Sequence, residues 1–351
     1  MSPAATGPGR RRAPRPRRTP GRATAVGTGE AGRRALQERR EPSRGPQGGR
    51  RAENRVWLVP FQHSAVIIRR AGGRIGCRGP CSMTSQRYRR VIVGFDGSPA
   101  AVTALDWASA EARLHGASLV ICTVVPDGQE PATSDTLATL RRSVQELTGG
   151  EPEVRCVPGS PAVALITACT PSDLLVLGAH GRSALAGVLL GSVSRACLHR
   201  APCPVAVVPA TGERPRHDRV IAAVDGSGPS RRALRAAAIE AELRGASLRV
   251  VHAVHWDPLG VEWITPTKEQ LVAWGERLVA AELAATGVRA ITEVVHGHPK
   301  EVLIQAAQEA DLLVLGHRGR NPLAGLLLGS TSEHCARHAP CPVIVVRPPQ
   351  D

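Results

Sequence analysis

Two glycine-rich segments share one spacing that suits the binding of a phosphate group. The first has Gly178 and Gly181, then nine residues, then Gly191-Ser192, and residues 316–330 repeat this G-x2-G-x9-G-S pattern. Glycine lets the backbone approach an anion closely, and successive amide groups can point into one concavity. Free amides at the start of a following helix also favour phosphate. The pattern predicts a phosphate site in each segment, and tight turns followed by a helix cap are the alternative.

Polar side chains in and after these segments could complete such a site. Hydroxyl groups can donate hydrogen bonds to phosphate oxygens, and guanidinium groups can add positive charge. The hydroxyls belong to Ser192, Ser194, Ser330, Thr331 and Ser332, and the guanidinium groups belong to Arg182 and Arg320.

The two segments belong to two copies of one unit. Residues 91–98 recur 129 positions later at 220–227, and both stretches end in Asp-Gly-Ser. Residues 173–178 recur 138 positions later at 311–316, so the second copy holds nine extra residues, which we place near 256–266. Internal repeats decide the architecture of a chain. Here they put both glycine loops at the same point of the unit.

Short apolar runs alternate with helical patterns in each copy. In the first copy we expect strands at 91–95, 119–125, 154–157, 173–177 and 205–208, and helices at 98–115, 133–147, 160–169 and from 191. Continuous apolar runs are typical of strands covered on both faces. The alternation predicts an α/β fold of two tandem Rossmann-like domains, each a five-stranded parallel sheet with helices on both faces. Ligands of such sheets bind beyond the carboxyl ends of the strands.

The expected domains are residues 88–209, here called the first copy, and 218–347, the second copy, with a linker at 210–217. The strands at 205–208 and 343–346 are expected at sheet edges, and edge strands invite pairing. We therefore expect the two copies to pair with each other as an internal pseudo-dimer, and two chains to associate as a homodimer.

The net charge of +15 is confined to the N-terminal segment. Residues 1–82 hold 19 Arg and 4 Glu, with no Asp or Lys, so the remaining residues are neutral overall. Residues 1–87 are rich in Arg, Pro and Gly, and such a stretch cannot bury enough apolar area to order itself. We expect a disordered basic tail that contacts nucleic acid or anionic lipid; alternatively, translation starts at Met83 and the tail is not part of the protein.

Composition excludes several other classes of protein. Aromatic residues make up only 2% of the chain, so stacking platforms for single-stranded nucleic acid are not expected. No apolar run is long enough to span a membrane. The nine cysteines do not form paired Cys-x-x-Cys spacings, which favours reduced thiols and a cytoplasmic location.

Two further sets of residues could suggest metal or redox chemistry. Cys197 and Cys203 are repeated as Cys335 and Cys341, and the second copy has a histidine set that consists of His252, His255, His296 and His298. We interpret the thiols as core packing. Because the first copy has no equivalent of the histidine set, we interpret these histidines as solvated or packing residues.

The chain resembles the universal stress protein family in its tandem-domain form, over residues 88–208 and 218–347. The resemblance rests on the Asp-Gly-Ser after the first strand, the G-x2-G-x9-G-S loop, and the Ala-Pro-Cys-Pro-Val sequence at 201–205 and 339–343. It implies a five-stranded fold related to adenine-nucleotide-binding domains. It also implies that members with an intact glycine loop bind ATP, and both copies have this loop.

The resemblance implies a role for specific residues in each copy. Gly94 and Asp96, with their counterparts Ala223 and Asp225, would face the nucleoside. The main chain of Val124, or of Ala253, would read the adenine edge. The ribose and phosphates would be wrapped by Gly178, Ala179, His180, Gly181, Arg182 and Ser183, or by Gly316, His317, Arg318, Gly319, Arg320 and Asn321. The β and γ phosphates would be taken by Gly191, Ser192, Val193 and Ser194, or by Gly329, Ser330, Thr331 and Ser332. Ala223 departs from the family's glycine, so its methyl group is expected to crowd the second pocket.

We expect no dedicated enzyme, and at most slow ATP hydrolysis. Neither glycine loop contains lysine, so the P-loop pattern is absent. Asp96 or Asp225 could hold Mg²⁺ beside ATP, but no second carboxylate is placed to align a water molecule. His180 and His317 could shuttle protons, although a ligand-facing or solvated histidine is the more usual interpretation.

The leading functional hypothesis is therefore an ATP-binding, nucleotide-dependent regulator of a stress response. A non-catalytic interaction module with structural or vestigial pockets is the alternative. Nucleic-acid binding through the basic tail is a third hypothesis.

Overall fold

The structure, a computed structural model, describes residues 56–61, 64–69, 87–125, 152–181, 190–210, 215–255, 266–319 and 328–348, together with residues 138, 142 and 145. The chain divides into two units, Met1–Arg51 and Ala52–Asp351, and every described residue lies in the second. Of the helix predicted at 133–147, only residues 138, 142 and 145 are described, and each is helical.

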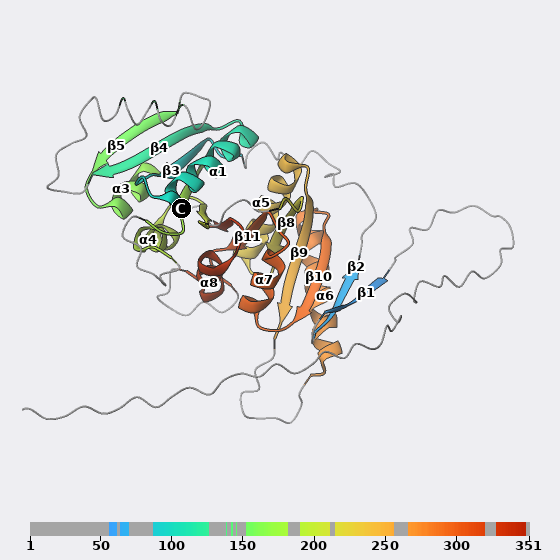
Figure 1. Cartoon of the computed structure of the whole chain (residues 1–351). Helices are drawn as coiled ribbons and strands as arrows, with labels where there is room; N and C mark the ends of the chain where they lie inside the picture. Colours follow the sequence, from blue (N-terminus) through green and yellow to red (C-terminus); the bar gives the residue numbers. More distant parts are fainter. Residues whose placement is uncertain are drawn as a thin grey trace, which may run out of the picture. The chain divides into compact units, whose positions relative to one another are not determined.

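Strands and helices alternate through both copies, as the sequence predicts (Figure 1). The first copy contains β3 (Arg90–Gly94), α1 (Pro99–His115), β4 (Ser118–Val125), β5 (Glu153–Pro158), α3 (Pro161–Ala168), β6 (Asp173–Gly178), α4 (Ser192–Arg200) and β7 (Val205–Val208). The second contains β8 (Arg219–Ala223), α5 (Gly228–Arg244), β9 (Ser247–Val254), α6 (Lys268–Thr286), β10 (Ile291–His296), α7 (Pro299–Ala307), β11 (Leu312–Gly316), α8 (Ser330–His338) and β12 (Val343–Val346).

Local sequence explains where the first helix of each copy begins and ends. The Ser98 side chain accepts a hydrogen bond from the Ala101 amide, and Pro99 occupies the first turn of α1. Serine is a favoured N-cap, and proline suits a position whose amide has no helical acceptor. The helix ends at Gly116, whose φ of 63° is in the left-handed region that glycine tolerates. In the second copy, Ser227 and Gly245 do the same for α5.

The five strands of each copy are parallel, and the two sheets join edge to edge. Strand order in the described sheet is β1-β2-β10-β9-β8-β11-β12-β7-β6-β3-β4-β5. The join is the antiparallel pair β12–β7, in which Val343 faces Val207 and Ile344 faces Ala206. These are the two strands that the sequence analysis places at sheet edges, so pairing removes both edges.

Two short strands next to β10 were not predicted from the sequence. β1 (Val56–Phe61) and β2 (Ser64–Arg69) form an antiparallel pair, and β2 pairs with β10. The segment is locally rich in Val and Ile, residues that favour strands. Pro60 lies in β1, the outermost strand in the sheet order, and edge strands are where proline is found in sheets.

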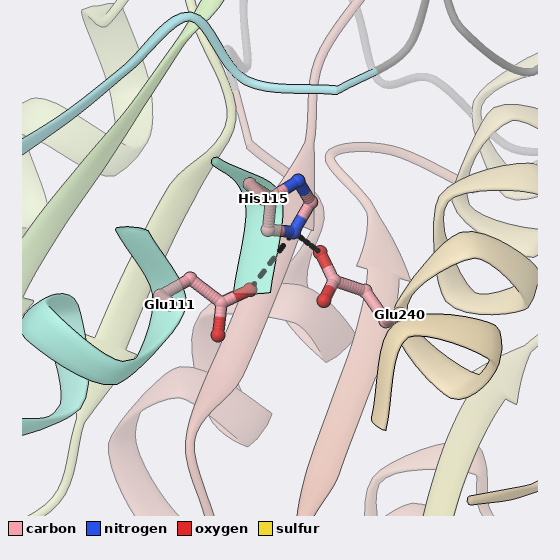
Figure 2. Close-up of side chains that lie close together, drawn as sticks. All are labelled: Glu111, His115 and Glu240. Atoms are coloured by element: carbon pink, nitrogen blue, oxygen red, sulfur yellow. Dashed lines mark hydrogen bonds and ion pairs between the residues drawn. The ribbon is translucent and has the colours of Figure 1, made fainter. Parts of the chain in front are cut away.

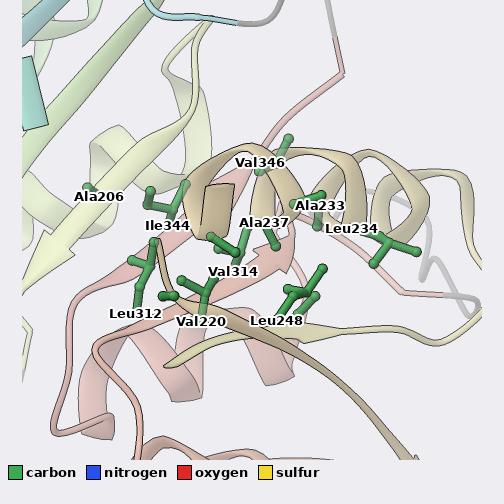
Figure 3. Packing of buried hydrophobic residues seen from close by; sticks show 14 of the residues in the cluster. Ala206, Val220, Ala233, Leu234, Ala237, Leu248, Leu312, Val314, Ile344 and Val346 are labelled. Atoms are coloured by element: carbon green, nitrogen blue, oxygen red, sulfur yellow. The ribbon is translucent and has the colours of Figure 1, made fainter. Parts of the chain in front are cut away.

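Each face of the sheet is covered by one hydrophobic core that runs through both copies. One core contains buried residues of α1, α5 and α6, and the other contains buried residues of α3, α4, α7 and α8. Figure 3 shows part of the first core, where Ala233, Leu234 and Ala237 of α5 lie over the side chains of the central strands. Ile344 of β12 belongs to the same cluster as Ala206 of β7, so the join between the copies is itself apolar.

A buried group of charged side chains from α1 and α5 lies where the two helices meet. Nε2 of His115 is 3.1 Å from Oε1 of Glu111 and 3.2 Å from Oε1 of Glu240, and all three side chains are 1% exposed (Figure 2). Arg244 forms ion pairs with both glutamates. We call these four residues the junction cluster. It links the two copies on the face of the sheet that α1, α5 and α6 cover.

Candidate functional site

The glycine loops lie where the strand order of each copy reverses. In the first copy, β4 and β5 follow on one side of β3, whereas β6 and β7 lie on the other side. Asp96 follows β3, and Gly178 ends the adjacent strand β6. The second copy has the same order, with Asp225 after β8 and Gly316 at the end of β11. A crevice beyond the carboxyl ends of strands at such a reversal is the usual ligand site of open parallel sheets.

A cavity of about 340 Å³ occupies this position in the second copy. Ligand pockets usually measure about 300–1,000 Å³. Ten of the thirteen residues expected to bind in this copy line the cavity: Ala223, Asp225, Ala253, Gly316, Arg318, Gly319, Gly329, Ser330, Thr331 and Ser332. Ala223 forms part of the wall, so its methyl group does not close the cavity. Of the other three residues, His317 is described outside the lining, and Arg320 and Asn321 lie outside the described residues.

The aspartate that follows the first strand of each copy, Asp96 or Asp225, lies against the second glycine of the loop. A Cβ atom on Gly319 would fall 2.7 Å from Oδ2 of Asp225, and one on Gly181 would fall 2.9 Å from Oδ2 of Asp96. Any side chain at either glycine would displace the carboxylate. The other carboxylate oxygen, Oδ1, accepts the amide hydrogen of Ser98 or of Ser227. The two copies therefore build the same close approach between strand end and glycine loop.

The helices that follow the glycine loops expose their first amides. Both α4 and α8 have glycine at the N-cap, Gly191 and Gly329, with no side-chain capping bond. The first helical amides, of residues 192–194 and 330–332, have no acceptor within the helix. Every other described helix either has proline in its first turn or, in α6, a capping box. Among the helices that the structure describes, α4 and α8 are the ones suited to receive an anion.

Two expected hydrogen-bond donors are used within the protein, which corrects the sequence prediction. The hydroxyl of Ser194 donates to the carbonyl of Gly178 at 2.8 Å, and the hydroxyl of Ser332 donates to that of Gly316 at 2.7 Å. A hydroxyl has one hydrogen to give. These serines therefore fasten the helix to the strand end, and Ser192, Ser330 and Thr331 remain as candidate hydroxyl donors.

The amides of Gly191 and Gly329 are also used within the loop. They donate to the carbonyls of Ala179 and His317, both at 2.7 Å. These bonds close the glycine loop onto the start of the helix. The cradle is therefore formed by the amides that follow the glycine, rather than by the glycine amide itself.

The expected adenine-reading positions lie past the end of a neighbouring strand. β3 stops pairing with β4 at Gly94, which faces Cys122, two residues before Val124. In the second copy, β8 stops at Ala223, which faces Val251, two residues before Ala253. The main chain of Val124 therefore lies beyond the end of β3, and that of Ala253 lies beyond the end of β8.

Comparison with known proteins agrees with this architecture. The sequence profile of the universal stress protein family matches residues 87–209 and 217–347. The chain belongs to the universal stress protein family. It is 32% identical over 291 residues to universal stress protein Rv2005c of Mycobacterium tuberculosis, which covers 75% of this chain and 98% of the relative. A universal stress protein of Mycolicibacterium smegmatis is 33% identical over 288 residues, covering 74% and 97%.

Solved structures share the fold of this universal stress protein. A universal stress protein from Archaeoglobus fulgidus superposes with a TM-score of 0.57 at 22% identity, covering 74% of this chain and 99% of that chain. The tandem α/β architecture and the family are therefore both established. A search of the described residues found no helix with both the length and the apolar character needed to cross a membrane.

Some glycines of this universal stress protein are required by packing rather than by a ligand. A Cβ atom on Gly178 would fall 2.8 Å from the carbonyl oxygen of Ala100, at the start of α1. On Gly316 it would fall 2.7 Å from the carbonyl carbon of Pro229, at the start of α5. On Gly94 it would fall 2.6 Å from Cδ2 of Leu177. These three positions hold strand ends against their neighbours, so they position the site without needing to contact a ligand.

The remaining expected site residues of the first copy are placed as follows. Ala179 is buried, and His180 is half-buried with Nδ1 buried and without a hydrogen-bond partner among the described residues. Ser192 and Val193 lie in the first turn of α4. Arg182 and Ser183 lie outside the described residues.

Neither of the sets considered for metal or redox chemistry forms a metal-binding group in the described part of the chain. Cys197, Cys203, Cys335 and Cys341 are fully buried in one hydrophobic core. Burial raises the pKa of the Cys197 and Cys335 thiols to about 12. The described group with metal-ligand geometry is Glu111, His115 and Glu240, and Arg244 already contacts both of its carboxylates.

Sequence reasoning missed part of the cavity wall. His252, interpreted from the sequence as a packing or solvated histidine, lines the cavity, and its Nδ1 lies 2.7 Å from the carbonyl oxygen of Val224. Pro299 and Leu303 of α7 also line it. His252 directly precedes Ala253, an expected adenine-reading position, and this was the sequence signal that could have placed it at the site. The α7 residues come from a helix that follows a different strand, so no local pattern links them to the loop.

Proposed function

We propose that this universal stress protein binds ATP in the pocket beside the glycine loop of each copy and acts as a nucleotide-dependent regulator of a stress response. The observation that carries the proposal is the 340 Å³ cavity of the second copy, which is lined by the strand-end aspartate, the glycine loop and the uncapped start of α8. Amides at a helix start suit the phosphates, and the apolar wall of Val224, Val251 and Leu303 suits a base.

The residues present fit an adenine nucleotide. Gly319 keeps the backbone close to Asp225, and the amides of residues 330–332 point from the start of α8. The main chain of Ala253, past the end of β8, offers groups to the edge of a base. Mg²⁺ usually binds one or two carboxylates together with phosphate oxygens, so Asp225 fits as its protein ligand when ATP is bound.

We propose binding without dedicated catalysis. Phosphoryl transfer needs groups that position the nucleophile and stabilise the transferred phosphoryl. The glycine loops contribute no lysine, and one oxygen of each strand-end aspartate is engaged by the amide of Ser98 or Ser227. Occupancy, rather than turnover, would then carry the signal, since a ligand that prefers one conformation shifts the population towards it.

Equilibrium dialysis of the full chain against ATP tests the proposal, with the double variant Gly191→Val and Gly329→Val as comparison. Both glycines have backbone angles that any residue adopts, φ of −68° and −73°, and a Cβ atom would meet nothing closer than 3.4 Å. The variant should therefore fold while its side chains fill the cradles. We expect saturable ATP binding by the wild type and none by the variant.

Circular dichroism and the melting temperature of the double variant serve as the folding control. Absence of ATP binding by the wild-type chain, or unchanged binding by a folded double variant, would overturn the proposal. The second result would favour the alternative, an interaction module whose pockets are structural.

A further inference from the structure

The two nucleotide sites carry different charge. Four positions around the end of β11 and β12 are basic in the second copy, and three of their four counterparts in the first copy are neutral side chains. The corresponding pairs are Arg232 and Thr103, His317 and Ala179, Arg318 and His180, and Arg347 and Pro209. We call the second-copy residues the basic cluster.

The members of the basic cluster act on one another. His317 is 8% exposed. Burial lowers its pKa, and the positive charges of Arg347, Arg318 and Arg232 lower it further, to about 4. Arginines of α5, of the glycine loop and just after β12 therefore make the surroundings of one buried imidazole electropositive.

These groups have buried polar atoms without hydrogen-bond partners. Nε of Arg232, Nε of Arg318 and Nδ1 of His317 are buried and lack a hydrogen-bond partner among the described residues. Arg347 donates to the carbonyl of Leu198 at 2.7 Å, which is a neutral acceptor.

No carboxylate of the described residues forms an ion pair with Arg232, Arg318 or Arg347, whereas Arg90 and Arg231 pair with Asp173 and Glu282. The three arginines are half-buried, so the cost falls on the buried Nε groups of Arg232 and Arg318, which have left water without finding an acceptor. Among the described residues, the partner that the basic cluster lacks is an anion.

Of the basic cluster, Arg318 borders the cavity, at the end where the phosphates are expected. Arg318 lines the cavity, and its Cα lies 3.4 Å from the position of a Cβ atom on Gly329, at the start of α8. Nη1 of Arg232 lies 3.8 Å from the equivalent position on Gly228, the first residue of α5. Arg318 thus flanks the start of α8, which already favours negative charge.

We propose that the second copy selects its ligand by the length of the polyphosphate chain, with Arg318, Arg232 and Arg347 neutralising the terminal phosphates of a nucleoside triphosphate. The first copy has Thr103, His180 and Pro209 at these positions, so its preference for a triphosphate rests on the amides at the start of α4 and is weaker. The inference rests on the proposed function, because it assumes that the cavity holds a nucleotide. Guanidinium groups bind phosphate with charge-assisted hydrogen bonds, and each is worth about 1.5–3 kcal/mol, or about tenfold or more in affinity.

Isothermal titration of single-site proteins tests the selection. The Gly191→Val chain leaves the second site open, and the Gly329→Val chain leaves the first. Each is titrated with AMP, ADP, ATP and inorganic triphosphate. In the Gly191→Val chain we expect ATP to bind at least about tenfold more tightly than AMP. In the Gly329→Val chain, we expect the ATP-to-AMP affinity ratio to be at least about tenfold smaller than in the Gly191→Val chain.

Replacing the basic cluster by neutral or first-copy residues should remove the preference. In the Gly191→Val background, Arg232→Thr with Arg318→His and Arg347→Ala should lower the ATP-to-AMP affinity ratio at least about tenfold, towards that of the first site, and leave AMP affinity nearly unchanged. The matched control is Arg235→Thr, which removes the same charge from an exposed position of α5, three residues beyond Arg232, and should keep the ratio. Melting curves verify that each variant folds.

The outcomes separate the two proposals. Equal affinity for AMP and ATP at the second site, or a ratio unaffected by the triple substitution, overturns the inference and leaves ATP binding intact. Failure of all three nucleotides to bind the wild-type chain overturns the proposed function. Inorganic triphosphate that binds the second site as tightly as ATP, and is lost in the triple variant, supports the basic cluster and shows that the adenine adds nothing.

Discussion

His115 and Arg244 occupy the same position in the two copies, and both side chains are directed at the same two carboxylates, those of Glu111 and Glu240. The glutamates are also equivalent positions, one helical turn earlier in α1 and α5. The junction cluster is thus built from one duplicated pair, in which the second cation has become arginine. The cluster carries no net charge when His115 is protonated and both glutamates are ionised.

The environment keeps His115 protonated at neutral pH. Burial opposes its charge, but hydrogen bonds to Glu111 and Glu240 outweigh this and raise the pKa of His115 to about 9. Burial and the negative charge of Glu240 raise the pKa of Glu111 to about 7. The ring of Tyr88 lies over the imidazole, with the centroids 4.5 Å apart.

The free energy of unfolding should fall as pH rises through about 9. A histidine whose pKa is raised from 6.5 in the unfolded chain stabilises the fold fully below pH 6.5, and this contribution is lost above its folded pKa. His115→Gln removes the contribution. We therefore expect the variant to be less stable than the wild type at pH 7.5 and to lose less stability between pH 7.5 and 9.5. Urea unfolding at both pH values measures the difference.

Titrations outside the junction cluster affect wild type and variant alike. Because His115→Gln also removes the hydrogen bond by which His115 lowers the pKa of Glu111, the difference reports His115 together with its two glutamate partners. Parallel loss of stability in both proteins over this pH range would contradict the prediction.

Arg244→Met should be much more damaging than the loss of an exposed ion pair. It leaves two carboxylates, each 1% exposed, with one imidazolium between them. Breaking a buried pair from one side costs about 3–5 kcal/mol. Arg216→Met removes an exposed pair with Asp218, with side chains 72% and 64% exposed, and such pairs are worth about 0–1 kcal/mol. Equal melting temperatures of the two variants would show that the junction cluster does not stabilise the protein.

The glycines of the loop should separate into structural and ligand-facing positions. Gly178→Ala forces a methyl group to within 2.8 Å of the Ala100 carbonyl oxygen, and overpacking of this kind costs about 1–3 kcal/mol. Gly191→Ala meets nothing closer than 3.5 Å, so stability should change by less than about 1 kcal/mol. Thermal unfolding compares the two. A larger loss of stability for Gly191→Ala than for Gly178→Ala would mean that the space around Gly191 is smaller than its 3.5 Å nearest contact indicates.

The duplication made the fold predictable from the sequence. Residues 91–98 and 220–227 fixed the start of each copy, and the apolar runs at 205–208 and 343–346 marked the strands that pair at the join. Caps such as Ser98 and Gly116 follow from local conformational preference. The pair β1–β2 was missed because its segment lies beside a long Arg- and Pro-rich stretch, and the composition of the whole N-terminal segment predicts disorder.

The site was predictable in its loops and not in its hydrogen bonds. The spacing of Gly316, Gly319 and Gly329 located the cavity, but it could not show that the Ser332 hydroxyl is spent on the Gly316 carbonyl. That bond depends on how α8 packs against the end of β11, which is a tertiary relationship. The junction cluster left a weak signal, a glutamate repeated on the apolar side of both first helices, but only the pairing of the copies brings Glu111 to Glu240.

The continuous cores predict that the two copies unfold together. Ile344 is fully buried, faces Ala206 across the antiparallel join, and belongs to a core that also contains Val91 and Leu105 of the first copy. Ile344→Ala should cost about 2–5 kcal/mol, and Ile344→Val about 0.5–1.5 kcal/mol. Ile344→Ala leaves a void inside a core that both copies share. Amide hydrogens in β3 of the first copy should therefore lose protection against exchange together with those in β8. Hydrogen exchange of the two strands measures this, and a loss confined to β8 would mean that the copies are stabilised independently.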